Sequence, residues 1–112
     1  MSKEESSPMA LWLLGTSSPT VFGGGSIRFQ IRREMSTNSG KLQAGMFTVF
    51  TLESISQLFN NAHFTMDHCD LEVFDLPLTG AWITVHTERK GTMYSSSIFD
   101  EENQLLARII IG

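Results

Sequence analysis

The sequence has very little cysteine, no long hydrophobic run and no excess of basic residues. Cys69 is the only cysteine, so no disulfide can form within the chain, and we expect a reducing, cytoplasmic environment. No apolar run approaches the roughly 20 residues that span a bilayer, so no membrane span is expected. The net charge is −4, and Lys and Arg are dispersed, which argues against a nucleic-acid partner.

The length of 112 residues fits a single small domain, which we predict over residues 21–112. Residues 1–20 form a predicted N-terminal tail that contains the short apolar segment Met9–Leu14. This segment is short for the core of a signal peptide, and it follows Glu4 and Glu5 instead of a basic stretch. We therefore expect it to form a short helix or strand that lies against the domain.

A strand followed by a long helix is predicted in the first half of the domain. Apolar and polar residues alternate over residues 26–34, which indicates a half-buried antiparallel strand. Residues 36–41 are rich in turn-forming side chains. The next apolar run is too long for one strand, and its residues fall almost all round a helical wheel. We predict a helix over 45–60 that is buried on most sides.

The second half of the domain is predicted to be entirely sheet. The expected strands cover residues 65–74, 81–88, 92–99 and 104–111. In the first of these, Cys69 is expected to be a small buried residue, and Arg89–Gly91 is expected to form a hairpin turn. Short turns force antiparallel neighbours, and a sheet with one apolar helix must wrap that helix. The predicted fold is therefore α+β, with five to six antiparallel strands around one long central helix.

This element order and several loop sequences resemble one known family. Residues 26–45, SIRFQIRREMSTNSGKLQAG, resemble the first strand and loop of small hotdog acyl-CoA thioesterases of the phenylacetate-pathway and thioesterase-superfamily-2 type. Thr65–Asp67 at the start of a strand and Arg89–Thr92 at a hairpin fit the later pattern, and the resemblance covers residues 22–112. It implies a single hotdog domain that acts on acyl-CoA, with coenzyme A as part of the substrate and no separate cofactor.

The resemblance also implies an active site, with two departures from the family pattern. The family has a His-Gly-Gly motif where the central helix begins, and Gln43-Ala44-Gly45 stands in that place here. The family's helix carboxylate falls on Leu52 by ungapped counting, and Glu53 is the next residue. Neighbouring helix residues differ by about 100° around the axis, so Glu53 fits the role only after a one-residue adjustment.

Other implied roles fall on polar residues of the loops and strands. The family's loop Asn falls on Thr37, with Asn38 beside it, and its strand Ser or Thr falls on Thr65. In the family, the hairpin that corresponds to Arg89, Lys90 and Gly91 lies near the phosphates of the coenzyme, across a dimer interface. Thr37 and the hairpin are therefore candidate substrate-binding residues, whereas Asn38 and Thr65 are candidate catalytic residues.

Thioester hydrolysis needs a carboxylate that activates water and donors that meet the developing oxyanion. Glu53 is the only acid inside the predicted helix, and a carboxylate on a mainly apolar face suits a general base. The backbone N–H groups of Ala44 and Gly45 are the candidate oxyanion donors at the positive end of the helix dipole. Gln43 can orient a carbonyl or a water molecule but cannot exchange protons.

Each of these residues also has a purely structural interpretation. Glu53 can lie on the solvent or dimer edge of the helix, and Gln43 can be an ordinary loop residue. Thr65 can satisfy its hydroxyl with the backbone, Asn38 can make a turn, and the hairpin tip can simply be solvated.

A metal site is the last alternative function for polar side chains of this sequence. The cluster Asp67–Asp70 contains His68 and Asp70, which can share one face of a strand. Two ligands do not close a zinc site, so we expect no metal.

Three functions are compatible with the predicted fold. The first is an acyl-CoA thioesterase that works as a homodimer or as a homotetramer built from two dimers. The second is a catalytically inactive acyl-binding, acyl-CoA-binding or assembly module, which the change to Gln43 and the displaced carboxylate favour. The third is a dehydratase or isomerase, which ranks last because its His–Asp pair is not visible. The fold by itself cannot choose among them.

Overall fold

The computed structural model describes residues 24–59 and 65–112, which form one α-helix, one 3-10 turn and a five-stranded sheet. In chain order the elements are β1 (Gly24–Gln30), η1 (Arg33–Met35), α3 (Met46–Leu58), β2 (Cys69–Val73), β3 (Trp82–Lys90), β4 (Met93–Phe99) and β5 (Leu105–Ile111). The strand order is β1-β3-β4-β5-β2, and every neighbouring pair is antiparallel. The prediction of an α+β fold with one central helix is confirmed, with five strands in the sheet.

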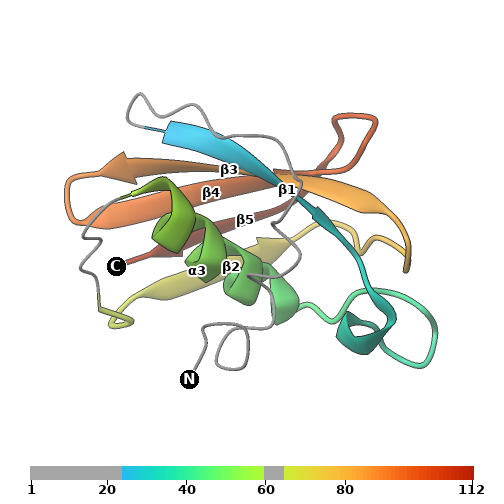
Figure 1. Cartoon of the computed structure of the whole chain (residues 1–112). Helices are drawn as coiled ribbons and strands as arrows, with labels where there is room; N and C mark the ends of the chain where they lie inside the picture. Colours follow the sequence, from blue (N-terminus) through green and yellow to red (C-terminus); the bar gives the residue numbers. More distant parts are fainter. Residues whose placement is uncertain (1–23, 60–64) are drawn as a thin grey trace, which may run out of the picture.

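Helix α3 lies across one face of the curved sheet, which bends around it (Figure 1). Its inward side chains recur at helical spacing and are buried: Phe47, Phe50, Thr51, Ser54, Ile55 and Leu58. The ring of Phe50 lies 4.6 Å from the ring of Phe29 on β1, measured between centroids. Burial of these large apolar side chains between helix and sheet stabilises the fold.

Strands β3 and β4 show the clearest alternation between buried and solvent-facing residues. Every second residue is buried in the first part of β3 and along β4, as expected for strands with one covered face. The two strands meet at a two-residue loop after Lys90, where Gly91 has a φ of 64°. Glycine tolerates this left-handed backbone, so the hairpin can turn tightly enough to hold the register.

The predicted first strand is too long. Strand β1 ends at Gln30, and Arg33–Met35 form a 3-10 turn instead of more strand. Met35 is buried in this turn, and the chain leaves the sheet here to reach the start of α3. The apolar periodicity continued past the end of the strand because Ile31 and Met35 are both core residues.

The second predicted strand is also too long, and the expectation for Cys69 is wrong. Strand β2 covers only Cys69–Val73, and Thr65 lies before it. Cys69 is exposed, as are most β2 residues, because β2 is an edge strand that pairs only with β5 within the described sheet. Arg89 and Lys90, predicted as turn residues, belong to β3.

The predicted long helix agrees closely with the structure at its C-terminal end. Helix α3 ends at Leu58, close to the predicted end at 60. The predicted tail of residues 1–20 and its segment Met9–Leu14 lie outside the described residues. Within the described part of the chain, no helix is both long and apolar enough to cross a membrane.

Candidate functional site

The start of α3 is held in place by a hydrogen-bonded loop. The N–H of Gln43 donates to the carbonyl of Met35 at 2.9 Å, and the N–H of Leu42 donates to the carbonyl of Pro77 at 2.9 Å. Leu42 is fully buried, whereas Gln43, Ala44 and Gly45 are exposed. The loop therefore presents these three residues at the surface on a fixed support.

Two backbone donors are available at this end of the helix. The N–H groups of Met46, Phe47 and Thr48 already donate to carbonyls three residues earlier, at 2.9 to 3.2 Å. The N–H groups of Ala44 and Gly45 donate to no residue in the described part of the chain. Free N–H groups at the positive end of a helix dipole can receive a negatively charged oxygen.

Glu53 lies farther along the same helix, and its side chain is half-buried, as is that of Leu52. One carboxylate oxygen of Glu53, Oε2, is buried. Glu53 is eight residues beyond Gly45, which at 1.5 Å per residue places it roughly 12 Å along the axis. One chain therefore does not bring the Glu53 carboxylate together with the N–H groups at its own helix start.

The loop before the helix contains Thr37 and Asn38. The Thr37 hydroxyl donates to the carbonyl of Lys41 at 3.1 Å and lies 2.9 Å from Ser39 Oγ. The N–H of Gly40 donates to the carbonyl of Thr37 at 2.9 Å and closes a turn with Asn38 exposed at its tip. Thr37 therefore supports the turn, and the Asn38 side chain points to the surface.

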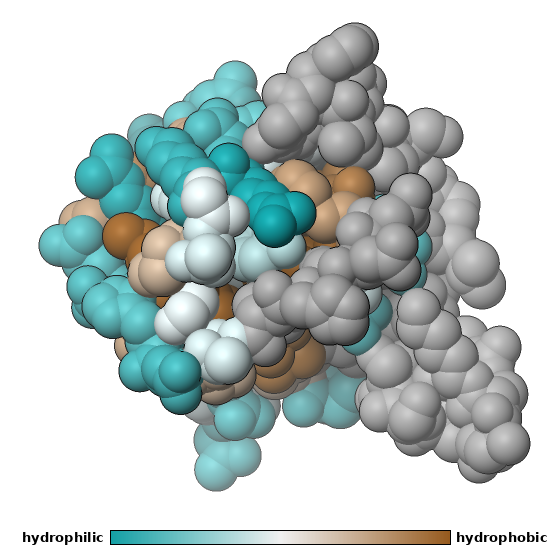
Figure 2. All heavy atoms as spheres, turned by 90° about the vertical axis from the view of Figure 1, so that its left-hand side faces the viewer, coloured by the Kyte–Doolittle hydropathy of each residue, from teal (hydrophilic) through white to brown (hydrophobic). Residues whose placement is uncertain are grey.

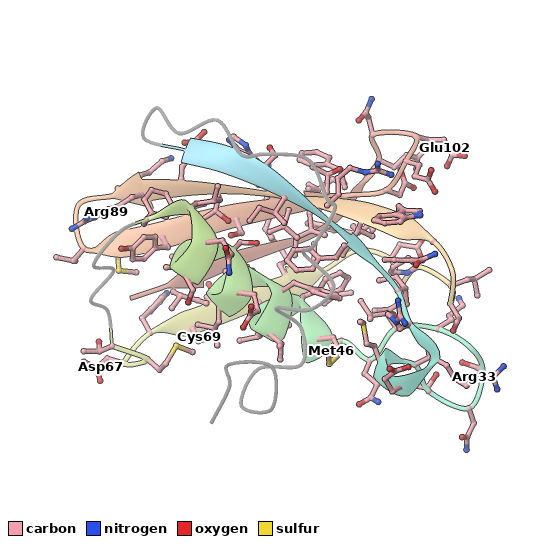
Figure 3. The ribbon with its side chains drawn as sticks, viewed as in Figure 1. Arg33, Met46, Asp67, Cys69, Arg89 and Glu102 are labelled. Atoms are coloured by element: carbon pink, nitrogen blue, oxygen red, sulfur yellow. The ribbon has the colours of Figure 1, made fainter. Side chains whose placement is uncertain are left out.

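Thr65 and the hairpin residues lie elsewhere. Thr65 is exposed, and its hydroxyl donates to Asp67 Oδ2 at 2.9 Å, so a neighbouring side chain and not the backbone satisfies it. Figure 3 shows Arg89 and Asp67 on the left side of the molecule and Met46 farther to the right. The same chain thus separates these residues from the start of α3.

Charged and hydrophobic side chains lie together at the β3–β4 hairpin. The Arg89 guanidinium lies 5.8 Å from the ring centroid of Tyr94, and its Nε donates to the carbonyl of Gly91 at 3.1 Å. Lys90 is exposed. Figure 2, which views this end, shows hydrophilic side chains with hydrophobic ones between them. This surface can meet an anionic group through Arg89 and Lys90.

The structure has a polar cavity beside the loop before α3 that was not predicted from the sequence. It has a volume of about 500 Å³, and its lining residues are Arg33, Ser36, Thr37, Asn38, Gly40 and Thr79. Thr79 lies in the turn before β3 and joins the loop only through tertiary contacts, so sequence spacing carried no signal for it. Its hydroxyl lies 2.6 Å from Ser36 Oγ and donates to the carbonyl of Gly40 at 3.0 Å.

A second group of interacting side chains, which was not predicted from the sequence, lies on the face of the sheet away from α3. Ser26 Oγ lies 3.0 Å from His86 Nδ1, and His86 Nε2 lies 3.0 Å from Glu88 Oε2. Ser26 and His86 are opposite each other in the β1–β3 ladder. The His86 and Glu88 side chains are 40% and 48% exposed, so solvent screens the interaction. We infer that these two hydrogen bonds stabilise the pairing of β1 with β3.

Among the described residues, no three His, Cys, Asp or Glu side chains converge to hold a metal ion. Asp67, Cys69 and Asp70 are all exposed around the start of β2.

The sequence matches no protein-family model and no curated protein. Solved structures, in contrast, match over most of the chain. The PaaI protein from the phenylacetic acid degradation operon of Escherichia coli has a TM-score of 0.77 and 13% identity. The match covers 96% of this chain and 87% of that one.

Two further structures are similar. Zebrafish thioesterase superfamily member 2 has a TM-score of 0.71 and 12% identity, over 86% of this chain and 76% of that one. A hypothetical thioesterase protein from Streptococcus pneumoniae TIGR4, solved with coenzyme A, has a TM-score of 0.74 and 8% identity. That match covers 91% of this chain and 86% of the other. At these identities the likeness establishes the backbone arrangement, and the chain has the hotdog fold of these thioesterase-superfamily proteins.

Proposed function

We propose that the chain is an acyl-CoA thioesterase-like hotdog protein that hydrolyses an acyl thioester. The observation that carries this proposal is the pair of exposed N–H groups, Ala44 and Gly45, at the start of a buried helix. They have no acceptor within residues 24–59 and 65–112, and they sit where a thioester oxygen can reach them. The coenzyme A bound by the S. pneumoniae protein supports acyl-CoA as the substrate class.

The proposed reaction uses Glu53 as a general base. The carbonyl oxygen of the thioester accepts hydrogen bonds from the Ala44 and Gly45 N–H groups while a water oxygen attacks the carbonyl carbon. Glu53 takes a proton from that water, the C–S bond breaks, and the protonated Glu53 carboxyl group returns this proton to the departing thiolate, which leaves the free acid and coenzyme A. Gln43 orients the water or the carbonyl, and it does not transfer protons.

We propose that each site is shared by two copies of the chain, in a homodimer or a dimer of dimers. The separation of roughly 12 Å between Gly45 and Glu53 along one helix leaves the site of a single copy incomplete. Strand β2 supports the pairing because it is an exposed sheet edge, and such edges readily pair with another strand. Val73 and Phe74, at the end of this edge, are 37% and 53% exposed.

The remaining predicted residues take substrate-binding or positioning roles in this proposal. Arg89, Lys90 and Gly91 of the second copy meet the phosphates of the coenzyme, since the hairpin carries exposed positive charge. Thr37, Asn38 and Thr65 remain candidates for holding the acyl group or the attacking water. An exposed, unpaired cysteine fits the expected reducing environment inside a cell.

The test is turnover of short, medium, long and aromatic acyl-CoAs by the wild-type chain and by Glu53→Gln. We expect loss of the general base to lower kcat by at least about 100-fold. Glu102→Gln is the matched control, because Glu102 is exposed in the β4–β5 turn (Figure 3) and should leave kcat unchanged. Released coenzyme A should be measured by chromatography, since the exposed Cys69 thiol reacts in colorimetric thiol assays.

A second candidate is an inactive acyl-CoA-binding module. Gln43 in place of a proton-exchanging histidine favours it, as does the offset between Leu52 and Glu53. Saturable binding of acyl-CoA without release of coenzyme A, for every acyl chain in the panel, would select this function over hydrolysis. Unchanged turnover in Glu53→Gln would instead remove Glu53 from the mechanism.

A further inference from the structure

The polar cavity beside the start of α3 is a built feature of the fold. Its wall forms where the loop after η1 crosses the segment Leu78–Thr79: the N–H of Thr79 donates to the carbonyl of Gly40 at 2.8 Å. Ser36 pairs with Leu42, and Lys41 pairs with Leu78, as isolated bridges. These contacts hold the wall in place without any contribution from a ligand.

The hydroxyl groups of the cavity stabilise this wall. Thr79 Oγ1 donates to the carbonyl of Gly40 at 3.0 Å, Ser36 Oγ donates to the carbonyl of Arg32 at 3.4 Å, and the two hydroxyl oxygens lie 2.6 Å apart. Thr37 Oγ1 donates to the carbonyl of Lys41. Their protons are therefore committed inside the protein, and the donors for a ligand must come from other lining residues.

Arg33 and Asn38 are those donors. Neither side chain makes a hydrogen bond or an ion pair with any residue in the described part of the chain. Together they offer five guanidinium N–H donors and two amide N–H donors. None of the six lining residues carries a carboxylate, although the chain as a whole has a net charge of −4. A cavity with one fixed positive charge and surplus donors selects an anion with several oxygens.

We propose that this cavity binds an oxyanion group, a phosphoryl or a carboxylate group, through Arg33 and Asn38. The group belongs to a ligand that lies along the surface toward the start of α3. The Gln43 N–H to Met35 carbonyl bond ties the cavity loop to that start, and Figure 3 shows Arg33 on the same side of the molecule as Met46. The inference does not depend on thioester hydrolysis, and its test uses no thioester.

The experiment is a titration of the ¹⁵N-labelled full chain followed by NMR at constant ionic strength. Inorganic phosphate, pyrophosphate and acetate are added separately, with chloride as the reference anion. We expect saturable shifts of the Asn38 and Gly40 amide signals with at least one oxyanion and none with chloride. Arg33→Gln should weaken that binding by about 10-fold or more, because a charged, forked donor is lost.

The controls make each outcome decisive. Arg32→Gln removes the same charge from the neighbouring residue, which does not line the cavity, and should leave the affinity within about 2-fold. Asn38→Ala provides a second variant at an exposed turn tip if Arg33→Gln does not fold. Stronger binding of pyrophosphate identifies a phosphoryl group, and stronger binding of acetate identifies a carboxylate group. Equal loss in Arg32→Gln and Arg33→Gln, or shifts no larger than with chloride, would overturn the proposal.

Discussion

The two ends of the molecule differ in what they offer a ligand. At the start of α3, the N–H groups of Ala44 and Gly45 have no acceptor among the described residues, and a polar cavity lies beside Arg33. The hairpin end carries exposed side-chain charge at Arg89 and Lys90. One end can stabilise a developing oxyanion, and the other can hold a charged group, yet a single chain keeps them apart (Figure 3). If both ends contribute to one site, as we propose, that site needs a second copy of the chain.

The largest expected effect tests the backbone donors at the helix start. Gly45→Pro removes one N–H while the φ of −62° at this position already suits proline. We expect kcat for acyl-CoA hydrolysis to fall by about 100-fold, as for loss of an oxyanion donor.

Gly45→Ala is the matched control for this change. It keeps the N–H, and an added Cβ meets no atom within 4 Å. Activity should therefore stay close to that of the wild type. Equal activity of the proline and alanine variants would remove the Gly45 N–H from the mechanism.

The next effect tests whether the Gly45 N–H and the Glu53 carboxylate of one site come from different copies. Mixed dimers of Glu53→Gln and Gly45→Pro chains contain one site with both defects and one site with neither. Random exchange between the two inactive variants should therefore restore about one quarter of wild-type turnover. The measurement is turnover after exchange, compared with each variant exchanged only with itself. No recovery, with mixed dimers shown by mass spectrometry, would place the whole site within one chain.

A smaller effect tests the edge through which two copies would pair. Phe74→Glu places a charge on a side chain that is 53% exposed next to the β2 edge. We expect the dimer dissociation constant to rise by about 10-fold while the unfolding temperature of the monomer stays nearly unchanged. Sedimentation over a range of concentrations measures this shift. The same charge introduced by Leu78→Glu, exposed away from the sheet edge, is the control.

The smallest effect tests the hairpin end. Lys90→Gln should raise KM for acyl-CoA by about 3-fold at low salt with kcat unchanged, because an exposed charge steers the coenzyme without touching the reacting atoms. The difference should disappear as ionic strength rises. An equal loss of kcat and kcat/KM would instead bring Lys90 into contact with the reacting group.

Much of this architecture was predictable, because local sequence patterns encode it. The alternation in β3 and β4 and the apolar run of α3 each specify an element that must bury one face. The limits of β1 and β2 were not predictable in the same way. The apolar periodicity of β1 continues into the 3-10 turn Arg33–Met35, where Met35 is buried. The sequence of β2 resembles that of a strand with one covered face, but β2 is mostly exposed and lies at an edge of the sheet.

The candidate site was only partly predictable. Gln43–Gly45 were identified through the resemblance, as the residues in the place of the family's His-Gly-Gly motif, and they are exposed at the start of the helix. The cavity beside them could not be predicted, because Thr79 comes from a turn about forty residues away from Ser36 and meets it only after folding. The separation of Glu53 from Gly45, in contrast, already follows from the predicted helix over 45–60, because eight residues at 1.5 Å each place them roughly 12 Å apart along the axis.

The sequence by itself determined the elements of this protein: a long apolar helix, alternating strands, tight turns at glycine and a single cysteine. Tertiary structure alone decided which polar groups meet and which remain apart. It united Arg33 with Thr79, separated the helix start from the hairpin, and placed β2 at an edge of the described sheet. The reason is physical: local patterns set which face of an element is buried, whereas contacts between distant residues depend on how those buried faces pack.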